Sequence, residues 1–128
     1  MLVEYLQFRG FNVHTAPDGA TALTLSSKLR PRLILMDLSM SQLDGLETTR
    51  RLRADTSTKD TIIVALTARV FADDRKQAQR AGCDAFIPKP FDLSTLADCV
   101  DRILQRGRRD LEFHTPLVAA PRNRRSHR

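Results

Sequence analysis

The chain has 128 residues, 41% of them hydrophobic, and a formal net charge of +6, which fits one domain with its own core. It contains no apolar run of about 18 residues, and the acidic Glu4 follows at once on the first three residues, so a membrane span and a secretory signal are both excluded and a cytoplasmic location is expected. Cys83 and Cys99 do not have the spacing of metal-binding cysteines. We expect them to be buried, unreactive thiols in a protein from a reducing compartment.

The positive charge is uneven along the chain. Residues 107–128 hold six arginines against Asp110 and Glu112, a net charge of +4, and this leaves +2 for everything before them. This segment has no apolar periodicity, so it is predicted to be a basic, disordered tail following a domain over residues 1–106.

Helical and strand patterns alternate along the chain, which predicts an α/β fold with a doubly wound parallel sheet and helices on both faces. In chain order the predicted elements are helix Met1–Arg9, strand Phe11–Ala16, a helix capped by Asp18, strand Leu33–Asp37, a helix capped by Asp44, strand Thr61–Leu66, helix Ala72–Ala81, strand Ala85–Ile87 and a helix from Asp92 to Gly107. The second helix is expected to turn Leu29 inward, and the third to expose Arg50, Arg51 and Arg53.

Polar side chains stand where three of these strands end. Asp37, Thr67 and Lys89 each have an ordinary interpretation, as a turn residue, a helix cap and a solvated loop residue. In a parallel sheet, however, all three strand ends meet at one edge, and such edges bind ligands. A carboxylate nucleophile, a hydroxyl donor and an ammonium group suit phosphoryl transfer to Asp37, which depends on positioning and charge neutralisation.

Three motifs then show a resemblance to the response-regulator receiver domains of two-component signalling, the CheY-like family. They are D-x-x-M-x-x-x-D-G from Asp37 to Gly45, LTA at Leu66–Ala68 and AGCDAFIPKPF at Ala81–Phe91. Thr67 follows Asp37 by 30 residues and Lys89 follows it by 52, which are the intervals of that family. The resemblance implies a flavodoxin-like sheet of order 2-1-3-4-5.

The resemblance also implies site roles. Asp37 would be the phosphoacceptor, Lys89 the phosphate-binding lysine, Thr67 the switch hydroxyl and Phe86 the switch aromatic, although Phe86 has a plain core interpretation too. Asp37 and the backbone carbonyl of Ser39 would bind Mg²⁺, and a cis bond is expected at Lys89-Pro90. Ser41 replaces the usual proline after Met40, and Arg69 stands where side chains tune phosphate lifetime.

The chain departs from the family at its beginning. The family's first strand, which is central in the sheet and ends in two Mg²⁺-binding acids, is missing here, since Met1 already lies in the first helix. We therefore expect an N-terminally truncated receiver, whose upstream codons encode that strand. We also expect weakened Mg²⁺ binding, slow phosphorylation, and low stability or self-association through exposed strand edges.

The leading functional hypothesis is a stand-alone receiver without an output domain. It would take a phosphoryl group on Asp37 from a histidine kinase or phosphotransfer protein and switch a surface that binds an unidentified protein. It is not expected to be an enzyme beyond self-catalysed phosphotransfer and dephosphorylation. The alternative is a phosphorylation-impaired interaction module. No membrane partner is predicted, and nucleic-acid binding by the tail is disfavoured because its only aromatic residue is Phe113.

Overall fold

The computed structural model describes residues 1–38, 42–68 and 71–108. Its described residues form a parallel sheet of order β1-β2-β3 with five helices, which confirms the predicted fold class with its first strand missing. The elements are α1 (Leu2–Phe8), α2 (Gly19–Leu29), β1 (Leu33–Asp37), α3 (Gln42–Ala54), β2 (Ile62–Thr67), α4 (Ala72–Ala81), β3 (Ala85–Pro88) and α5 (Leu93–Arg106). None of the helices in these ranges is long and apolar enough to cross a membrane.

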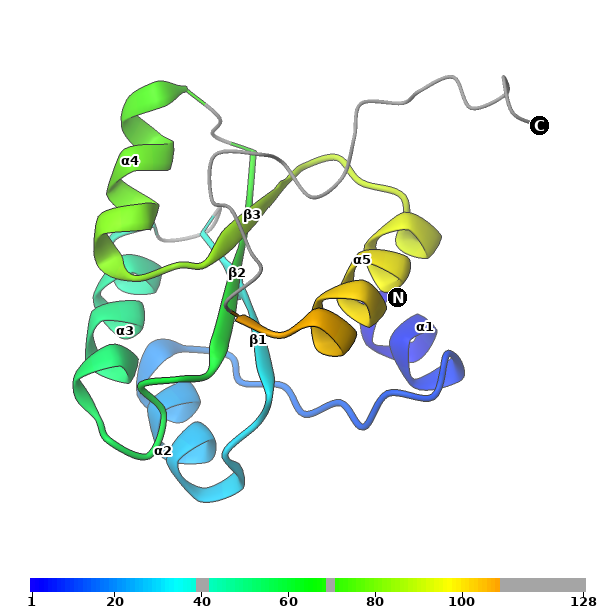
Figure 1. The fold of residues 1–128 in the computed structure, drawn as a ribbon, viewed down its shortest axis with the longest axis horizontal. Helices are drawn as coiled ribbons and strands as arrows, with labels where there is room; N and C mark the ends of the chain where they lie inside the picture. The colour runs from blue at the N-terminus through cyan, green and yellow to red at the C-terminus, as the bar shows by residue number, and fades with distance from the viewer. Residues whose placement is uncertain (39–41, 69–70, 109–128) are drawn as a thin grey trace.

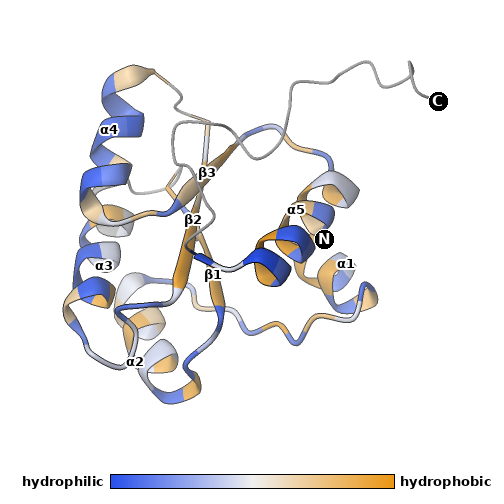
Figure 2. Ribbon diagram, viewed as in Figure 1, coloured by the Kyte–Doolittle hydropathy of each residue, from blue (hydrophilic) through white to orange (hydrophobic). Residues whose placement is uncertain are grey.

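The sheet separates two layers of helices (Figure 1). Helices α1 and α5 pack together on one side, while α2, α3 and α4 lie on the other. Every residue of β2 is buried, and alternate side chains enter opposite cores: Val64 and Leu66 join the α5 side, and Ile63 and Ala65 the α3 side. Figure 2 shows hydrophobic strands between the helices, with many hydrophilic residues on α3 and α4.

The prediction of a strand at Phe11–Ala16 was wrong, because this segment has no strand structure. A strand needs a neighbour for its backbone N–H and C=O groups, and in the described part of the chain β1 pairs with β2 alone. Phe11 and Val13 still pack by their side chains against the core on the α5 side. The apolar residues of this segment therefore pack against the core as their alternation predicts, but its backbone does not pair as a strand.

The region around β1 and α2 is less completely buried than the centre of the sheet. The only fully buried residues of α2 are Gly19 and Ser26, and Leu29, predicted to point inward, is 43% exposed. In β1, the apolar residues Leu33, Ile34 and Leu35 are only partly buried, unlike every residue of β2. The apolar side chains beside this sheet edge are thus more exposed than their sequence pattern predicts, and they gain less from burial.

Two of the three predicted caps occupy the N-cap position, but only one makes the capping hydrogen bond. The Asp18 carboxylate accepts a hydrogen bond of 2.8 Å from the Thr21 amide, as predicted. Asp92 occupies the N-cap of α5 without a side-chain hydrogen bond to a helix amide; its carboxylate accepts from the Ser94 and Thr95 hydroxyls at 3.4 Å. Asp44 is not a cap, because α3 already begins at Gln42.

Arg53, predicted on an exposed helix face, instead forms a buried ion pair. Its guanidinium donates to Asp84 Oδ2 at 2.7 Å, and the two side chains are only 15% and 10% exposed. It also donates to three carbonyl oxygens, those of Lys59, Thr61 and Gly82. One side chain thus joins the end of α3 to the beginnings of β2 and β3. Burial lowers the pKa of Arg53, and the facing Asp84 carboxylate opposes that shift.

We predict that Arg53→Ala lowers the free energy of unfolding by about 3 kcal/mol, because three carbonyl oxygens lose their donor and the largely buried Asp84 carboxylate keeps only Arg108 as a cationic partner. Arg51→Ala is the matched control: Arg51 is 66% exposed and pairs with Glu47 on the helix surface, so its loss should cost about 0.5 kcal/mol. Chemical denaturation of both variants measures the difference. Equal losses would contradict a structural role for the buried pair.

Candidate functional site

The strand register brings the three predicted site residues to one edge of the sheet. Asp37, the last residue of β1, lies opposite Leu66, and Thr67 follows as the last residue of β2. Thr67 in turn lies opposite Pro88, and the Lys89 amide donates to the Thr67 carbonyl at 2.9 Å. The convergence predicted from the three strand ends is therefore confirmed.

An ion pair joins the acid and the amine at this edge. Lys89 Nζ lies 2.9 Å from Asp37 Oδ2, with the two side chains 29% and 45% exposed. The Lys89–Pro90 peptide bond is cis, as the resemblance implied. The carboxylate is thus open to solvent on part of its surface while an ammonium group neutralises one of its oxygens.

The two predicted switch residues are enclosed. Thr67 is 5% exposed, and Phe86 is 2% exposed within the core on the α3 side. The Arg75 guanidinium of α4 lies over the Phe86 ring, 5.9 Å from its centre. Sequence reasoning missed Arg75, although it precedes the buried Ala78 by three residues and so shares its helix face.

Part of the acceptor loop lies outside the described residues, including Ser39, Met40 and Ser41, as does Arg69. Gly45, in the first turns of α3 after this loop, occupies a crowded position. A Cβ atom there would stand 2.6 Å from Leu38 Cδ2, and Leu38 is only 2% exposed. The glycine of the D-G pair therefore lets α3 approach the residue that follows Asp37.

The described residues do not supply a complete Mg²⁺ site. Mg²⁺ requires near-octahedral oxygen ligands, usually one or two carboxylates together with waters. Asp37 offers a carboxylate of which one oxygen faces Lys89, and no group of three or more His, Cys, Asp or Glu side chains that could hold a metal occurs in the described ranges.

Neither cysteine contributes a nucleophile. Burial raises the pKa of the Cys83 thiol to about 11, and the Thr49 hydroxyl, 4.0 Å away, opposes the shift. Burial also raises the pKa of Cys99. Because the thiolate is the reactive form, both sulfurs are held in their unreactive protonated state at neutral pH.

We predict that Cys83 reacts with iodoacetamide at pH 8 roughly 100-fold more slowly than an exposed cysteine, given its raised pKa of about 11 and its burial. Peptide mass mapping of the native and the urea-unfolded protein measures the two rates. Similar rates in the two states would show that the thiol is neither buried nor shifted.

Comparison with known proteins agrees with this geometry. Residues 1–101 match the family model described as the response regulator receiver domain. The chain therefore belongs to the receiver-domain family of two-component response regulators, as its motifs predicted.

The relatives are response regulators. Response regulator MprA of Mycobacterium leprae (strain TN) is 40% identical over 106 residues, which cover 82% of this chain and 45% of the relative. MprA of Mycobacterium sp. (strain KMS) is 41% identical over 114 residues, which cover 88% of this chain and 48% of the relative. The chain thus spans slightly less than half the length of these curated relatives.

Solved structures show the same fold. Vibrio cholerae chemotaxis protein CheY4 matches with a TM-score of 0.74 and 30% identity, over 80% of this chain and 86% of that one. The receiver domain of sensor histidine kinase PA1611 from Pseudomonas aeruginosa PAO1 matches with a TM-score of 0.69 and 33% identity, over 85% and 87%. That structure has a magnesium ion coordinated in its active-site cleft.

Proposed function

We propose that this receiver accepts a phosphoryl group on Asp37 from a histidine kinase or histidine phosphotransfer protein and thereby switches a protein-binding surface. The observation that carries the proposal is the 2.9 Å approach of Lys89 Nζ to Asp37 at the edge where Thr67 ends its strand. An exposed carboxylate with an ammonium group beside it is what phosphoryl transfer requires of a protein acceptor.

The proposed transfer is a displacement at phosphorus. An Asp37 oxygen attacks the phosphorus of a phosphohistidine, a P–O bond forms, the P–N bond breaks, and the leaving imidazole nitrogen takes up a proton. The Lys89 ammonium group then faces the phosphoryl oxygens as a point charge. Receiver domains typically use Mg²⁺ for part of this neutralisation. Because the described residues provide one carboxylate, we propose that this chain binds the ion weakly.

The proposed readout uses Thr67 and Phe86. A phosphoryl group on Asp37 would attract the Thr67 hydroxyl, and Phe86, which already packs inward beneath Arg75, would be favoured in that position. Phosphorylation would then bias two arrangements of the surface near β3 and α5 rather than create a new one.

We predict that Asp37→Asn abolishes phosphate incorporation from acetyl phosphate, whereas Asp73→Asn, an exposed change in the first turn of α4, leaves it intact. Lys89→Met should slow incorporation by about 100-fold, since it removes the charge that faces the phosphoryl oxygens. Intact-protein mass spectrometry and radiolabel counting measure both effects. Undiminished base-labile label in Asp37→Asn would refute the assignment.

The same assay distinguishes a second candidate function, a phosphorylation-impaired interaction module. This candidate is favoured by the single carboxylate that the described residues offer to Mg²⁺ at the site. Labelling with and without Mg²⁺ separates the two: slow incorporation with little stimulation by the ion supports a weakened acceptor. A wild-type chain that takes up no label in either condition supports the interaction module.

We further predict that Thr67→Ala still becomes phosphorylated but loses the effect of phosphate on surface structure, because the hydroxyl that would follow the phosphoryl group is gone. Thr95→Ala, a hydroxyl removal in the first turn of α5, is the control. Amide exchange of β3 and α5, measured with and without acetyl phosphate, reports the change. If acetyl phosphate changes amide exchange by the same amount in Thr67→Ala as in the wild type, Thr67 is not the switch residue.

A further inference from the structure

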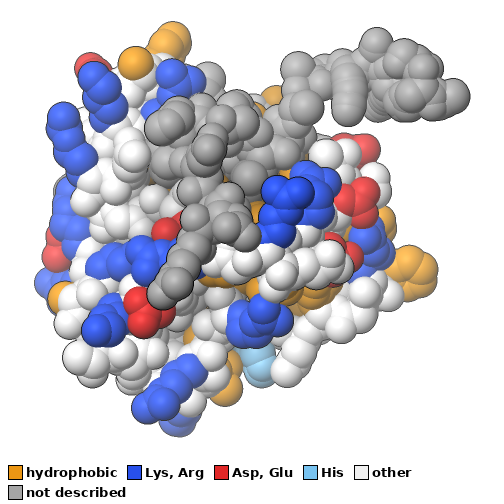
Figure 3. All heavy atoms as spheres, in the orientation of Figure 1, with side chains coloured by type: hydrophobic (Ala, Val, Ile, Leu, Met, Phe, Trp, Pro, Cys, Tyr) orange, Lys and Arg blue, Asp and Glu red, His pale blue; other side chains and the backbone are white. Residues whose placement is uncertain are grey.

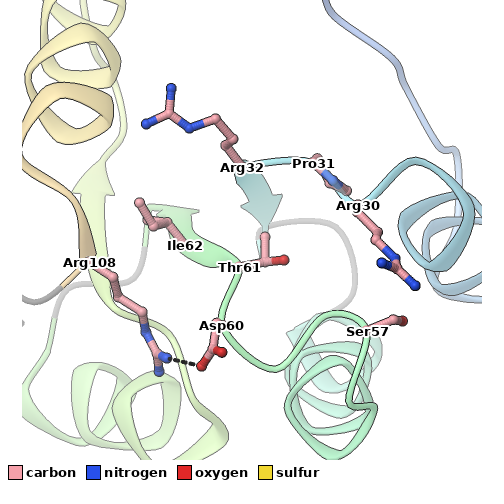
Figure 4. Close-up of a pocket in the computed structure, with 8 residues that line it drawn as sticks. All are labelled: Arg30, Pro31, Arg32, Ser57, Asp60, Thr61, Ile62 and Arg108. Atoms are coloured by element: carbon pink, nitrogen blue, oxygen red, sulfur yellow. Dashed lines mark ion pairs between the residues drawn. The ribbon is translucent and has the colours of Figure 1, made fainter.

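Positive side chains gather at the edge of the sheet opposite the Asp37 site, where the strands begin. A shallow cavity of about 310 Å³ lies there, and three of its lining residues are arginines: Arg30 after α2, Arg32 before β1 and Arg108 after α5 (Figure 4). Ser57, Asp60 and Thr61 complete its polar lining. The tertiary structure thus brings the connection between α2 and β1, with two arginines, beside Arg108 near the other end of the described chain.

One further cation, Lys59, lies beside this cavity. The Lys59 carbonyl accepts from Arg108 at 3.4 Å, and the Leu104 carbonyl in the last turn of α5 accepts from Arg32 at 2.7 Å. We call the following set the basic rim: Arg30, Arg32, Lys59 and Arg108. Figure 3 shows Lys and Arg side chains spread over the lower part of this face, with a few acidic ones among them.

The acids of this region offset only part of the charge. Asp60 is 83% exposed and lies 3.6 Å from Arg108, and Asp55, whose pKa is lowered chiefly by its hydrogen bonds with Ser57, also feels the charge of Arg30. Asp84 is held between Arg53 and Arg108, at 2.7 and 2.6 Å. Arg108 is therefore largely committed to its acidic partners, and Arg30 is offset in part by Asp55. Arg32 donates instead to the neutral Leu104 carbonyl, so the least compensated charge lies along Arg30 and Arg32.

The directions of the three arginines decide what kind of anion fits. In Figure 4 the Arg30 side chain extends toward the Ser57 side, Arg108 meets Asp60, and Arg32 points away from both. The groups do not converge, so they are unsuited to enclosing one small anion. Cations spread along a surface suit a polymer that presents anions at regular intervals.

The polymer that this pattern favours is a nucleic-acid duplex. The guanidinium group of arginine forms bidentate hydrogen bonds with phosphate oxygens. The sequence beyond the rim adds five arginines against two acids within residues 109–128. The rim residues include no aromatic side chain on which single-stranded bases would stack. We propose that the basic rim binds the phosphate backbone of duplex DNA without sequence preference.

Binding of this kind depends steeply on salt. If the rim contacts about three or four phosphates, raising the salt from 50 to 200 mM should weaken binding roughly 40- to 150-fold. The rim lies at the opposite edge of the sheet from Asp37, so the interaction should be the same for wild type and Asp37→Asn. Its outcome is therefore independent of the phosphoacceptor proposal.

Fluorescence anisotropy with a labelled 30-base-pair duplex and the full chain tests the proposal. The variant Arg30→Gln/Arg32→Gln should lose at least 10-fold in affinity at 50 mM salt and lower the salt slope by about 2. The control Arg50→Gln/Arg51→Gln removes the same charge from the outer face of α3, where the two side chains are 50% and 66% exposed, and should stay within twofold of wild type. Thermal unfolding of both variants confirms that each is folded.

Several outcomes would overturn the proposal. Equal losses in the two double variants would mean that net charge alone drives binding, and an unchanged Arg30/Arg32 variant would exclude the rim. Loss of all binding in Arg122→Gln/Arg124→Gln/Arg125→Gln alone would place binding in the terminal segment. Polyglutamate that competes as well as unlabelled duplex, at equal charge, would indicate an acidic protein surface rather than DNA.

Discussion

The parallel pairing of β2 with a strand on each side is the constraint on which this structure depends. β2 is buried along its whole length, and its register sets where both neighbours end. Asp37 and Lys89 are 52 residues apart in sequence, yet they meet at 2.9 Å because their strands flank this one element. A displacement of either neighbour by one residue would turn its side chains to the opposite face and separate the acid from the amine.

The opposite edge of the sheet is held by electrostatics rather than by apolar packing alone. Asp84 accepts from the Ile63 amide at 2.9 Å and from Arg53 at 2.7 Å, so the start of β3 is fixed to β2 and to the end of α3. Removing one partner of a largely buried ion pair is costly, because the remaining charge stays in a site with little solvent. β3 therefore runs between two charged anchors, Asp84 at its beginning and Lys89 at its end.

The two edges carry different chemistry on one scaffold. At the carboxyl edge, a partly exposed carboxylate faces one ammonium group, an arrangement suited to a small, transferable group. At the amino edge, several cations spread around a shallow cavity, an arrangement suited to an extended surface. At the lateral edge of the sheet, by contrast, β1 has no second neighbour in the described part of the chain, and Leu33, Ile34 and Leu35 are only partly buried. Stability on this side rests on side-chain packing, without the backbone hydrogen bonds that a further strand would add.

Apolar periodicity and strand-terminating polar residues are local signals, so the helices and strands from Leu33 onward and the three strand ends could be predicted from the sequence. Leu33–Asp37 was predicted residue for residue, and the motifs around Asp37, Thr67 and Lys89 led to the family. Three other outcomes depended on tertiary contacts: Phe11–Ala16 does not pair as a strand, Arg53 is largely buried against Asp84, and Arg75 covers Phe86. The tertiary structure also brought Arg30, Arg32 and Arg108 to one cavity. These outcomes depend on which distant segment lies beside each residue, and neither periodicity nor local spacing encodes that neighbour.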